Sequence, residues 1–397
     1  MIEGIDLMSA LNGIRIVDLS QVMAGPYCSM LLADMGADVI KIEPPTGENT
    51  RRWPPHIDGE SAAFMAINRN KRSMTLNLKD DEDKKIFYKL IETADVLVEN
   101  YRPGVVKRLG VDYDTLNKIN PRLVYCSISG FGQYGPYSSR GGYDLIAQGM
   151  TGIMSVTGER GGNPVKCGLP ITDLGVALFA AYGILSALYA RVQSNEGQFI
   201  DASLFDTGLA LSVWESTQYW VNGETPEPTG SGHRLSAPYQ AFQASDGYFT
   251  VGADTPHHWP VFCHIIGRPE FLNDERFVDD PSRIKHLKVF IQLIEEKTSK
   301  RPRSYWLEKF EEVGIPAGPI NSYPESLTDS HTISRRMVEE LEHPIAGKIK
   351  ALGIPIKLSK NPGQIRNAAP LLGQHTEEIL KELGLEKSDQ SYKELNI

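Results

Sequence analysis

The sequence of 397 residues predicts an α/β protein in which a large domain with a doubly wound, Rossmann-like parallel sheet is joined to a smaller α+β domain. Short apolar runs alternate with helical segments through the early part of the chain, which is typical of a parallel sheet covered by helices. After about Asn222 the chain becomes rich in turns and then shows a hairpin pattern, which indicates a second domain. The length allows more than one core, because single cores stop growing at about 250–300 residues.

The elements of the large domain are expected in a regular order. Apolar runs predict strands at 14–19, 38–43, 73–78, 96–98 and 123–128. A helix is expected over 27–35, because Pro26 suits the first helical position and Gly36 ends the segment. A second helix is expected over 80–93, where apolar residues recur at helical spacing behind an acidic first turn.

The second domain is expected over 225–325. Residues 238–252 predict a hairpin that turns at Ser245-Asp246-Gly247, and helices are expected near 257–266, 284–299 and 303–313. The last segment, 326–397, holds predicted strands near 347–358 and a helix near 375–384. This segment is too short to fold alone, so we expect it to rejoin the large domain that begins with 1–224.

Charge and composition argue against several classes of function. With a net charge of −9, the chain is poorly suited to a general nucleic-acid surface. Its four cysteines are far apart and its nine histidines form no His-x-x-x-His pair, so no metal site is expected. The adjacent pair His257-His258 does not change this, because neighbouring residues on a helix do not face one site.

Signals for export or membrane insertion are weak. The N-terminus has neither a basic nor an apolar leader region, and the cysteine pattern suits a reducing compartment, so we expect a cytoplasmic protein. The uncharged segment 174–190 is the one membrane candidate, but it is shorter than the about 20 apolar residues that a span needs. Its small residues favour a buried helix, and no membrane partner is expected.

Asp173 is the only charged residue between Lys166 and Arg191. It lies where a proline-containing segment gives way to an Ala-rich helix. One interpretation is a helix cap, because an aspartate there accepts backbone N–H bonds and stabilises the helix by about 1 kcal/mol. The other is a carboxylate nucleophile in a dry pocket. The residue pattern at this point leaves both open.

The strand, loop and helix at the start of the chain raise the possibility of dinucleotide binding. The first loop, Gln21 to Pro26, lacks the Gly-x-Gly-x-x-Gly pattern that lets a backbone approach a pyrophosphate. Glu43, at the end of the second predicted strand, resembles the ribose-binding acid of such folds only in its position. NAD is therefore not expected.

Nine unusual strings occur in order along almost the whole chain. They are 18–26 (DLSQVMAGP), 68–73 (NRNKRS), 99–104 (ENYRPG), 127–136 (SISGFGQYGP), 142–148 (GYDLIAQ), 170–173 (PITD), 238–242 (PYQAF), 314–321 (GIPAGPIN) and 370–376 (PLLGQHT). Together they resemble the class III CoA-transferase family, also called CaiB/BaiF. Each string is a weak signal alone, but nine in order make a specific match.

The resemblance implies a fold, a catalytic residue and a set of partners. Family members are interlocked homodimers in which each chain passes through a hole in the other, and both ends of the sequence build the large domain. The family's catalytic aspartate matches Asp173. Its CoA-contacting positions match Met23, Ala24, Leu76, Lys79, Asn100, Tyr101, Arg102, Arg108 and Tyr143. The implied partners are an acyl-CoA, a carboxylic acid and a second copy of the chain, with coenzyme A as cofactor and no metal.

Coenzyme A also makes physical demands that this sequence meets. Its phosphates need cations, and six basic residues in or near the matching strings can supply them: Lys71, Arg72, Lys79, Arg102, Lys107 and Arg108. The alternative is that about half of these are ordinary solvated charges. Tyr101 and Tyr143 likewise either contact the coenzyme or are partly buried packing residues.

Differences within the family narrow the reaction. The racemase branch carries a histidine where this chain has Tyr143, so the second proton-transfer group of that reaction is missing. The formyl-CoA:oxalate type carries a glutamine where this chain has Met23, and a longer run of glycines in its small domain. Here 229–232 is a short Thr-Gly-Ser-Gly stretch, a candidate lid, followed by His233 and Arg234.

This stretch is closer to the dicarboxylate branch, such as the succinyl-CoA:glutarate (hydroxymethylglutarate) CoA-transferases. A cation at His233 or Arg234 suits the far carboxylate of a diacid, and the alternative is a flexible linker with solvated charges. We expect a transferase in which Asp173 attacks the thioester and carries CoA as an aspartyl-CoA thioester. An ordinary aspartate pKa of about 3.9 would keep this nucleophile ionised. A family isomerase and a non-catalytic acyl-CoA-binding protein are the alternatives.

Overall fold

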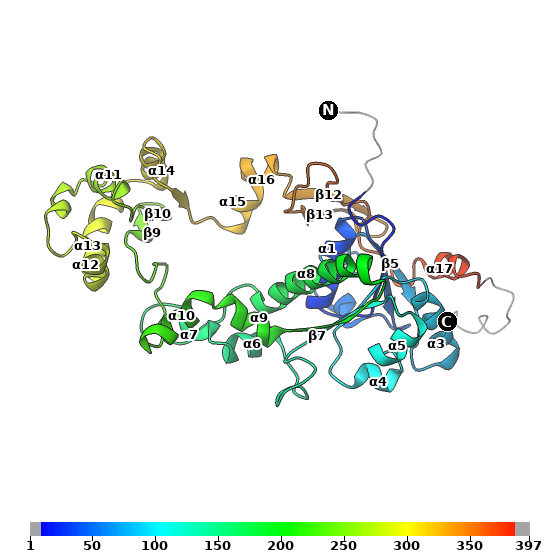
Figure 1. Ribbon diagram of the computed structural model, residues 1–397. Coiled ribbons are helices and arrows are strands. Elements are labelled where there is room, and N and C mark those ends of the chain that lie inside the picture. Colours follow the sequence, from blue (N-terminus) through cyan, green and yellow to red (C-terminus); the bar gives the residue numbers. More distant parts are fainter. Residues whose placement is uncertain (1–8, 386–397) are drawn as a thin grey trace. The chain divides into compact units, whose positions relative to one another are not determined.

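The computed structural model describes residues 9–385, which form two compact units (Figure 1). The first unit contains the described part of 1–153 together with 167–216 and the chain from Ser330 onward. The second contains 154–166 and 217–329. The segment 154–166 therefore belongs to the smaller unit, whereas the sequence pattern placed it in the large domain. The predicted absence of a leader rests in large part on residues 1–8, which lie outside the described residues.

A six-stranded parallel sheet is the centre of the first unit, with the strand order β5-β2-β1-β6-β7-β8. The strands are β1 (Arg15–Asp18), β2 (Asp38–Glu43), β5 (Lys71–Thr75), β6 (Val96–Glu99), β7 (Val124–Ser129) and β8 (Phe199–Ser203). This large parallel sheet confirms the predicted α/β class. The order reverses between β1 and β6, and open sheets of this kind bind ligands beyond the carboxyl ends of their strands at such a point.

Five of the six strands match predicted ones, and two details differ. β5 begins at Lys71, two residues earlier than predicted, because a lysine and an arginine in the strand obscure its apolar pattern. β8 was not predicted. It is an edge strand next to β7, and Asp201 at its centre interrupts the apolar run.

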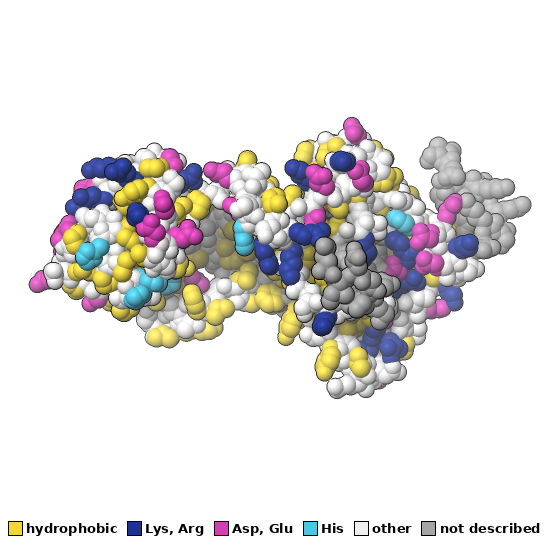
Figure 2. Space-filling view, turned by 90° about the horizontal axis from the view of Figure 1, so that it is seen from above, with side chains coloured by type: hydrophobic (Ala, Val, Ile, Leu, Met, Phe, Trp, Pro, Cys, Tyr) yellow, Lys and Arg dark blue, Asp and Glu magenta, His cyan; other side chains and the backbone are white. Residues whose placement is uncertain are grey.

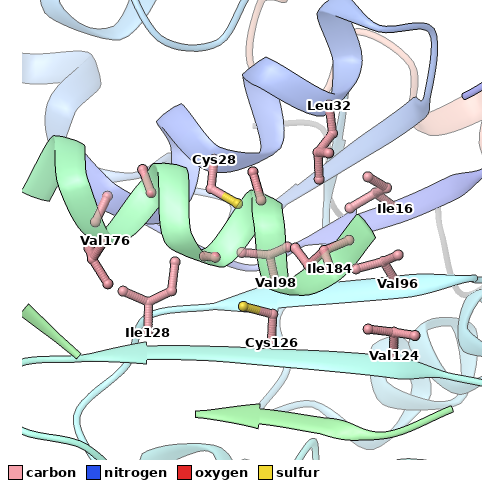
Figure 3. Close-up of a cluster of buried hydrophobic side chains, with 14 of the residues drawn as sticks. Ile16, Cys28, Leu32, Val96, Val98, Val124, Cys126, Ile128, Val176 and Ile184 are labelled. Carbon is pink, nitrogen blue, oxygen red and sulfur yellow. The ribbon is translucent and has the colours of Figure 1, made fainter. Parts of the chain in front are cut away.

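Helices α1 (Ala24–Asp34) and α8 (Ile171–Ser194) cover one face of the sheet, where their side chains meet those of β1, β6 and β7 (Figure 3). The close approach of α8 depends on small residues, since Ala177, Ala180 and Ala187 are at most 4% exposed. Cys28 of α1 and Cys126 of β7 also lie in this core, and none of the four cysteines forms a disulfide.

The opposite face of the sheet carries α3 (Asp81–Ile91), α5 (Tyr113–Ile119) and α17 (Thr376–Glu382). The side chain of Asp80 begins α3 by accepting the N–H groups of Glu82 and Asp83. The end of the chain packs on this unit, because α17 lies beside β5 and its Glu382 pairs with Arg72.

Helix α8 is buried on one face only, whereas the sequence favoured a buried helix. Its outer face is exposed in the single chain, at side chains that are between 44% and 83% accessible: Leu178, Phe179, Tyr182, Leu185, Tyr189 and Val192. Within residues 9–385, α8 is the one helix long and apolar enough to cross a membrane. Half of its most apolar window is buried against the rest of the unit, as in a core helix, so this composition is weak evidence for a span.

The second unit is built on the predicted hairpin. Its three antiparallel strands are β9 (Tyr239–Ala244), β10 (Gly247–Gly252) and β11 (Ala317–Pro319). Its helices include α11 (His258–Ile265), α12 (Asp280–Lys285), α13 (Leu287–Thr298), α14 (Arg303–Glu311) and α15 (Tyr323–Thr328). Fully buried phenylalanines form the core, with Phe242, Phe249, Phe262, Phe290 and Phe310 all at 0% exposure.

The remaining elements are short. They are β3 (His56–Ile57), β4 (Glu60–Ser61), α2 (Ala62–Met65), α4 (Val105–Leu109), α6 (Asp144–Met150), α7 (Ile153–Val156), α9 (Leu204–Leu211), α10 (Val213–Asn222), α16 (Ser330–Ser334), β12 (Val338–His343) and β13 (Gly347–Leu352). On the face shown in Figure 2, acidic, basic and hydrophobic side chains are mixed, and no large field of one charge sign covers it.

Candidate active site

Asp173 is the third residue of α8 and lies in its first turn. The residue in the capping position is Pro170, and no side chain caps the helix. Within residues 9–385 the carboxylate of Asp173 accepts no hydrogen bond and forms no ion pair. The capping interpretation is therefore wrong, and the helix begins with a partly buried carboxylate that has no partner.

The surroundings of Asp173 raise its pKa to about 6, chiefly because burial disfavours the charge and secondarily because Asp144 carries a like charge. The ordinary value expected from the sequence therefore does not apply. At pH 7 the carboxylate is still ionised by about ten to one. It is also more basic than an ordinary aspartate, which suits a nucleophile.

Asp144 is held in place by the start of α8. Its Oδ1 accepts the Thr172 N–H at 2.9 Å and the Thr172 hydroxyl at 2.8 Å, and its Oδ2 accepts Gln148 Nε2 at 2.6 Å. Gln148 Oε1 in turn accepts the N–H of Cys167 at 2.8 Å. Thr172 and Gln148 are fully buried, so this network connects α6 to α8 beside Asp173. The sequence had shown Asp144 only within a matching string, next to Tyr143.

The loop between β1 and α1 is held by hydrogen bonds at Ser20 and Gln21. The carboxylate of Asp18 accepts the Ser20 N–H, while Lys41 Nζ donates to the Ser20 carbonyl at 2.8 Å. The side chain of Asn100 both accepts the Gln21 N–H and donates to the Gln21 carbonyl, each at 2.7 Å. Val22 has φ +69°, a conformation that a β-branched residue adopts only under strain. The strained loop thus leads directly into the next residue, Met23.

Met23 and Ala24 mark the beginning of α1, with Met23 in the capping position and Ala24 3% exposed. Asn100 lies next to them in space but uses both polar groups of its side chain on Gln21. Its side chain therefore positions the loop. The hydroxyl of Tyr101 accepts Gln21 Nε2 at 3.3 Å and supports the same loop.

Two of the six expected phosphate cations are not available. Lys71 is 2% exposed, and its Nζ binds Asp18 Oδ2 at 3.0 Å, the Pro26 carbonyl at 2.8 Å and Asn68 Oδ1 at 2.8 Å. Burial, only partly offset by the charge of Asp18, lowers the pKa of Lys71 to about 8. Arg72 is held in ion pairs that connect β2 and α17 to its strand. The prediction for these two cations was wrong, because both are used in the fold.

The other four cations remain exposed. They are Lys79, Arg102, Lys107 and Arg108, and none of them forms an ion pair within the part of the chain that the structure describes. Leu76 follows β5 and is 4% exposed, and Tyr143 precedes α6 with 69% of its surface exposed. The predicted CoA positions thus follow the carboxyl ends of β1, β5, β6 and β7, around the point where the strand order reverses.

His233 and Arg234 lie in the second unit, whereas Asp173 lies in the first. The N–H of His233 donates to the Tyr239 carbonyl at 2.9 Å, and Arg234 Nη1 donates to the Glu227 carbonyl at 2.5 Å. The Thr-Gly-Ser-Gly stretch before them is tied down at Gly230, whose N–H donates to the Gly158 carbonyl at 2.9 Å. Both predicted substrate residues are therefore ordered by backbone contacts of their own unit.

Comparisons with known proteins identify the family of this chain. A mouse protein named succinyl-CoA:glutarate CoA-transferase is 39% identical over 95% of this chain and 87% of its own. An acetyl-CoA:oxalate CoA-transferase from Acetobacter aceti is also 39% identical, over 94% of this chain and 95% of its own. A crystal structure of a CAIB/BAIF family protein from Brucella suis matches with a TM-score of 0.87 and 36% identity, over 94% of this chain and 99% of that one. The model of CoA-transferase family III matches residues 11–376, and the chain belongs to that family of enzymes.

Proposed function

We propose that this enzyme is an acyl-CoA:carboxylate CoA-transferase that takes CoA from succinyl-CoA or a related dicarboxylyl-CoA. The observation that carries the proposal is the carboxylate of Asp173, which is partly buried, has a raised pKa and has no hydrogen-bonding partner within residues 9–385. An aspartate that capped the helix would accept backbone N–H groups with its side-chain oxygens. One left without partners is available for bond formation.

The chemistry proceeds by two exchanges at Asp173. Its carboxylate attacks the donor thioester, releases the CoA thiolate and forms a mixed anhydride. The thiolate attacks the Asp173 carbonyl of that anhydride, so the donor acid leaves and an aspartyl-CoA thioester forms. The acceptor carboxylate then attacks this thioester, and the thiolate released attacks the acyl carbonyl of the new anhydride. The products are the acceptor's CoA ester and a regenerated Asp173 carboxylate.

The residues around Asp173 support this cycle in two ways. The pKa of about 6 leaves most of the carboxylate ionised at pH 7 while making it more nucleophilic than an ordinary aspartate. The network of Asp144, Gln148 and Thr172 holds the start of α8, so the nucleophile keeps one position while its charge is lost and regained. Exclusion of water matters, because both the anhydride and the thioester hydrolyse.

Binding of the CoA ester follows from the groups at the carboxyl ends of the strands. The loop from Gln21 to Ala24 supplies a rigid surface, and the exposed Arg102 and Arg108 supply positive charge for phosphates. Lys79, Lys107 and Tyr143 are exposed beyond the ends of the neighbouring strands and extend this surface.

The identity of the CoA donor and of the acceptor acid is the most specific part of the proposal. The identities do not separate the choices, since the relative named for glutarate and the relative named for oxalate are both 39% identical. The preference for a longer diacid rests on His233 and Arg234, which offer a cation for the far carboxylate. We expect Arg234→Ala to reduce the preference for succinyl-CoA with a dicarboxylate acceptor by roughly tenfold, with kcat/KM for formyl-CoA and oxalate as the comparison.

The proposed enzyme acts as a homodimer. The exposed side chains of α8 recur at 178, 182, 185, 189 and 192, the spacing of a helix that packs along its length against another element. Helix α10 has no buried residue, and Trp214 and Trp220 on it are 75% and 77% exposed. We expect a second copy of the chain to cover these exposed side chains, because members of the family are interlocked dimers. Light scattering at low protein concentration should give twice the mass of the chain, and a stable, active monomer would contradict this.

The central experiment is an exchange assay read by mass spectrometry. The protein is mixed with succinyl-CoA and a panel of carboxylates, and new CoA esters are identified by mass. With succinyl-CoA alone, the peptide that contains Asp173 should gain the mass of CoA less one water. Efficient formyl transfer to oxalate with no turnover of any longer diacid would overturn the donor assignment. Exchange without a modified Asp173 peptide, even after rapid quenching in acid, would overturn the mechanism.

A further inference from the structure

A row of polar side chains crosses the three adjacent strands β6, β7 and β8. Glu99 of β6 is the register partner of Ser127 of β7, which is the partner of Asp201 of β8. Because side chains alternate along a strand, all three point to the same face. Glu99 and Ser127 are each 1% exposed. Within residues 9–385, Asp201 Oδ1 is the only buried side-chain oxygen or nitrogen without a hydrogen-bonding partner.

This polar row supports two separate segments of chain. Glu99 Oε2 accepts the N–H of Tyr101 at 2.8 Å, which fixes the turn 100–102. Ser127 Oγ accepts Gln133 Nε2 at 2.9 Å, and Asp201 Oδ2 accepts the N–H of Gln133 at 2.9 Å, which fixes the loop 130–142. Ser127 is the register partner of Glu99 on the neighbouring strand, and its hydroxyl stabilises the charge of Glu99, so the two supports are linked.

The two segments also meet each other. The loop 130–142 closes on itself, because Gly130 and Gly142 approach so closely that a Cβ on Gly130 would stand 2.6 Å from the Cα of Gly142. It therefore places Tyr143 directly beyond the end of β7. A Cβ on Gly141 would stand 3.1 Å from Arg102 Nη2, so the end of the loop lies against the turn 100–102.

We propose that Glu99 is a positioning residue for CoA binding, which orders the turn 100–102 and the loop 130–142 together through the polar row. The inference rests on the proposed function for the identity of the ligand, because the turn 100–102 carries Tyr101 and Arg102 and the loop 130–142 leads directly into Tyr143. Glu99 itself lies beneath the turn and does not need to touch the coenzyme. Its effect is to hold the coenzyme-binding segments in the conformation that binds.

The ionised form of Glu99 is the form that gives full support. A carboxylate can accept hydrogen bonds from the Tyr101 N–H and the Ser127 hydroxyl at the same time, whereas the protonated acid must use one oxygen as a donor. Burial raises the pKa of Glu99 to about 7, the hydrogen bonds from Ser127 and Tyr101 favour the charge, and the charge of Asp201 disfavours it. Ordering should therefore increase as the pH rises through 7.

The other charged and titratable groups around Glu99 do not reverse this direction. Tyr125 and Cys126 of β7 both feel its charge, and burial raises the pKa of each, so both stay neutral. A cavity of about 310 Å³ beside Glu99 is also lined by Lys107, Asp112, Tyr113 and Asp114. These four residues lie in or next to α4 and α5, outside the row of hydrogen bonds. Tyr101 is itself part of the turn 100–102.

The test compares binding of free CoA to wild type and Glu99→Gln by calorimetry between pH 6 and 8.5. Glutamine has the shape of the protonated acid and can neither ionise nor accept at both atoms. We expect the wild-type Kd to fall several-fold as the pH rises through 7, and the variant to keep the weaker, acid-side affinity at every pH. Asp114→Asn is the matched control, because it removes an exposed carboxylate from the rim of the same cavity and should follow wild type.

A second measurement needs no ligand and separates this inference from the proposed function. Hydrogen exchange is measured at one fixed pH of 8, so that intrinsic exchange rates cancel between proteins. Glu99→Gln should speed exchange in peptides covering both 100–102 and 130–142. Unchanged exchange in either segment, or a variant whose CoA affinity follows the wild-type pH profile, would overturn the positioning role. Failure of wild type to bind CoA, with the exchange result as expected, would instead contradict the proposed function.

Discussion

Two aspartates of the first unit illustrate how the surroundings of a carboxylate differ between a structural role and the proposed catalytic role. Asp18 ends β1 and is completely buried, and it binds Lys71, Ser20 and Ser29. Asp173 begins α8, is partly exposed and binds nothing within residues 9–385. Burial opposes the charge of both. For Asp18, the positive charges of Lys71 and Lys41 outweigh the effect of burial and hold its pKa far below the usual range. For Asp173, the negative charge of Asp144 adds to the effect of burial and raises the pKa further.

The contrast shows how to read a buried carboxylate. One that is surrounded by cations and donors keeps its charge at every physiological pH and contributes to folding. One that is buried beside another acid, without donors, keeps its charge at a cost and is available to react. The position of each partner, rather than the degree of burial alone, separates the two roles.

The largest expected effect is on activity, at Asp173. Asp173→Ala should reduce CoA exchange at least about a thousandfold, because no other carboxylate takes its place as nucleophile. Stability to urea should stay within about 1 kcal/mol of wild type, and CoA should still bind. Asp173→Asn, of the same shape, is the control for packing. Retained exchange in both variants would remove Asp173 from the mechanism.

The next effect is on folding, at Asp18. Asp18→Ala should lower the free energy of unfolding by about 3–5 kcal/mol, because Lys71 and Lys41 would remain buried without their shared counter-charge. Urea denaturation followed by circular dichroism measures this loss. The variant protein that does fold should bind CoA more weakly, since Ser20 and the loop after it lose their support. A change under about 1 kcal/mol would mean that the buried cluster rearranges and that Asp18 is dispensable.

The contrast extends to cations, where Lys71 is buried and Arg108 is exposed. Arg108→Ala should weaken the binding of all CoA esters by about 1.5–3 kcal/mol, as expected for one charge-assisted phosphate contact. The acceptor acid should not matter, and KM for several acyl-CoA donors provides the measurement. Lys89→Ala on α3, an exposed cation paired with Glu92, is the control. An effect confined to the acceptor acid would show that Arg108 binds the acceptor and not the phosphates of CoA.

The smallest effect is a shift in pH dependence. Because the pKa of Asp173 is about 6, kcat/KM of wild type should fall as the pH drops through 6 and the nucleophile is protonated. Asp144→Asn removes the neighbouring charge and should move this limb to lower pH by less than about one unit. Folding stability should respond to pH in the opposite direction to activity. The pKa of Asp173 is higher in the folded protein than the about 3.9 of an unfolded chain, so its contribution to the free energy of unfolding is lost as the pH rises from about 3.9 toward 6. An acid limb that does not move would show that Asp144 acts only through hydrogen bonds.

Local patterns predicted the parts of the molecule that depend on local sequence. Apolar runs located five strands of the sheet, and the isolated charge of Asp173 marked the start of α8. The resemblance to the family supplied positions at the ends of β1, β5, β6 and β7. Strand spacing and helix starts could be predicted because they are properties of neighbouring residues, whereas the role of the matching positions in binding CoA stays a prediction.

Pairings across the chain explain what the sequence missed. Lys71 belongs to a string of basic residues that looks solvated, and its partner Asp18 is 53 residues away. The polar row of Glu99, Ser127 and Asp201 exists only because three strands align in one register. The raised pKa of Asp173 depends on Asp144, which is 29 positions earlier in the numbering. Each of these requires the fold before it can be recognised.

The burial of the cysteines has a practical consequence for following this enzyme in solution. Cys28, Cys126 and Cys263 are buried, and burial raises the pKa of all three thiols, which makes them slow to react. Cys167 is partly exposed and lies six residues before Asp173, with its N–H on Gln148. A thiol-reactive fluorophore added in limiting amount should label Cys167 first. The native chain thus carries its own attachment point for a spectroscopic reporter beside the start of α8, without removal of any cysteine.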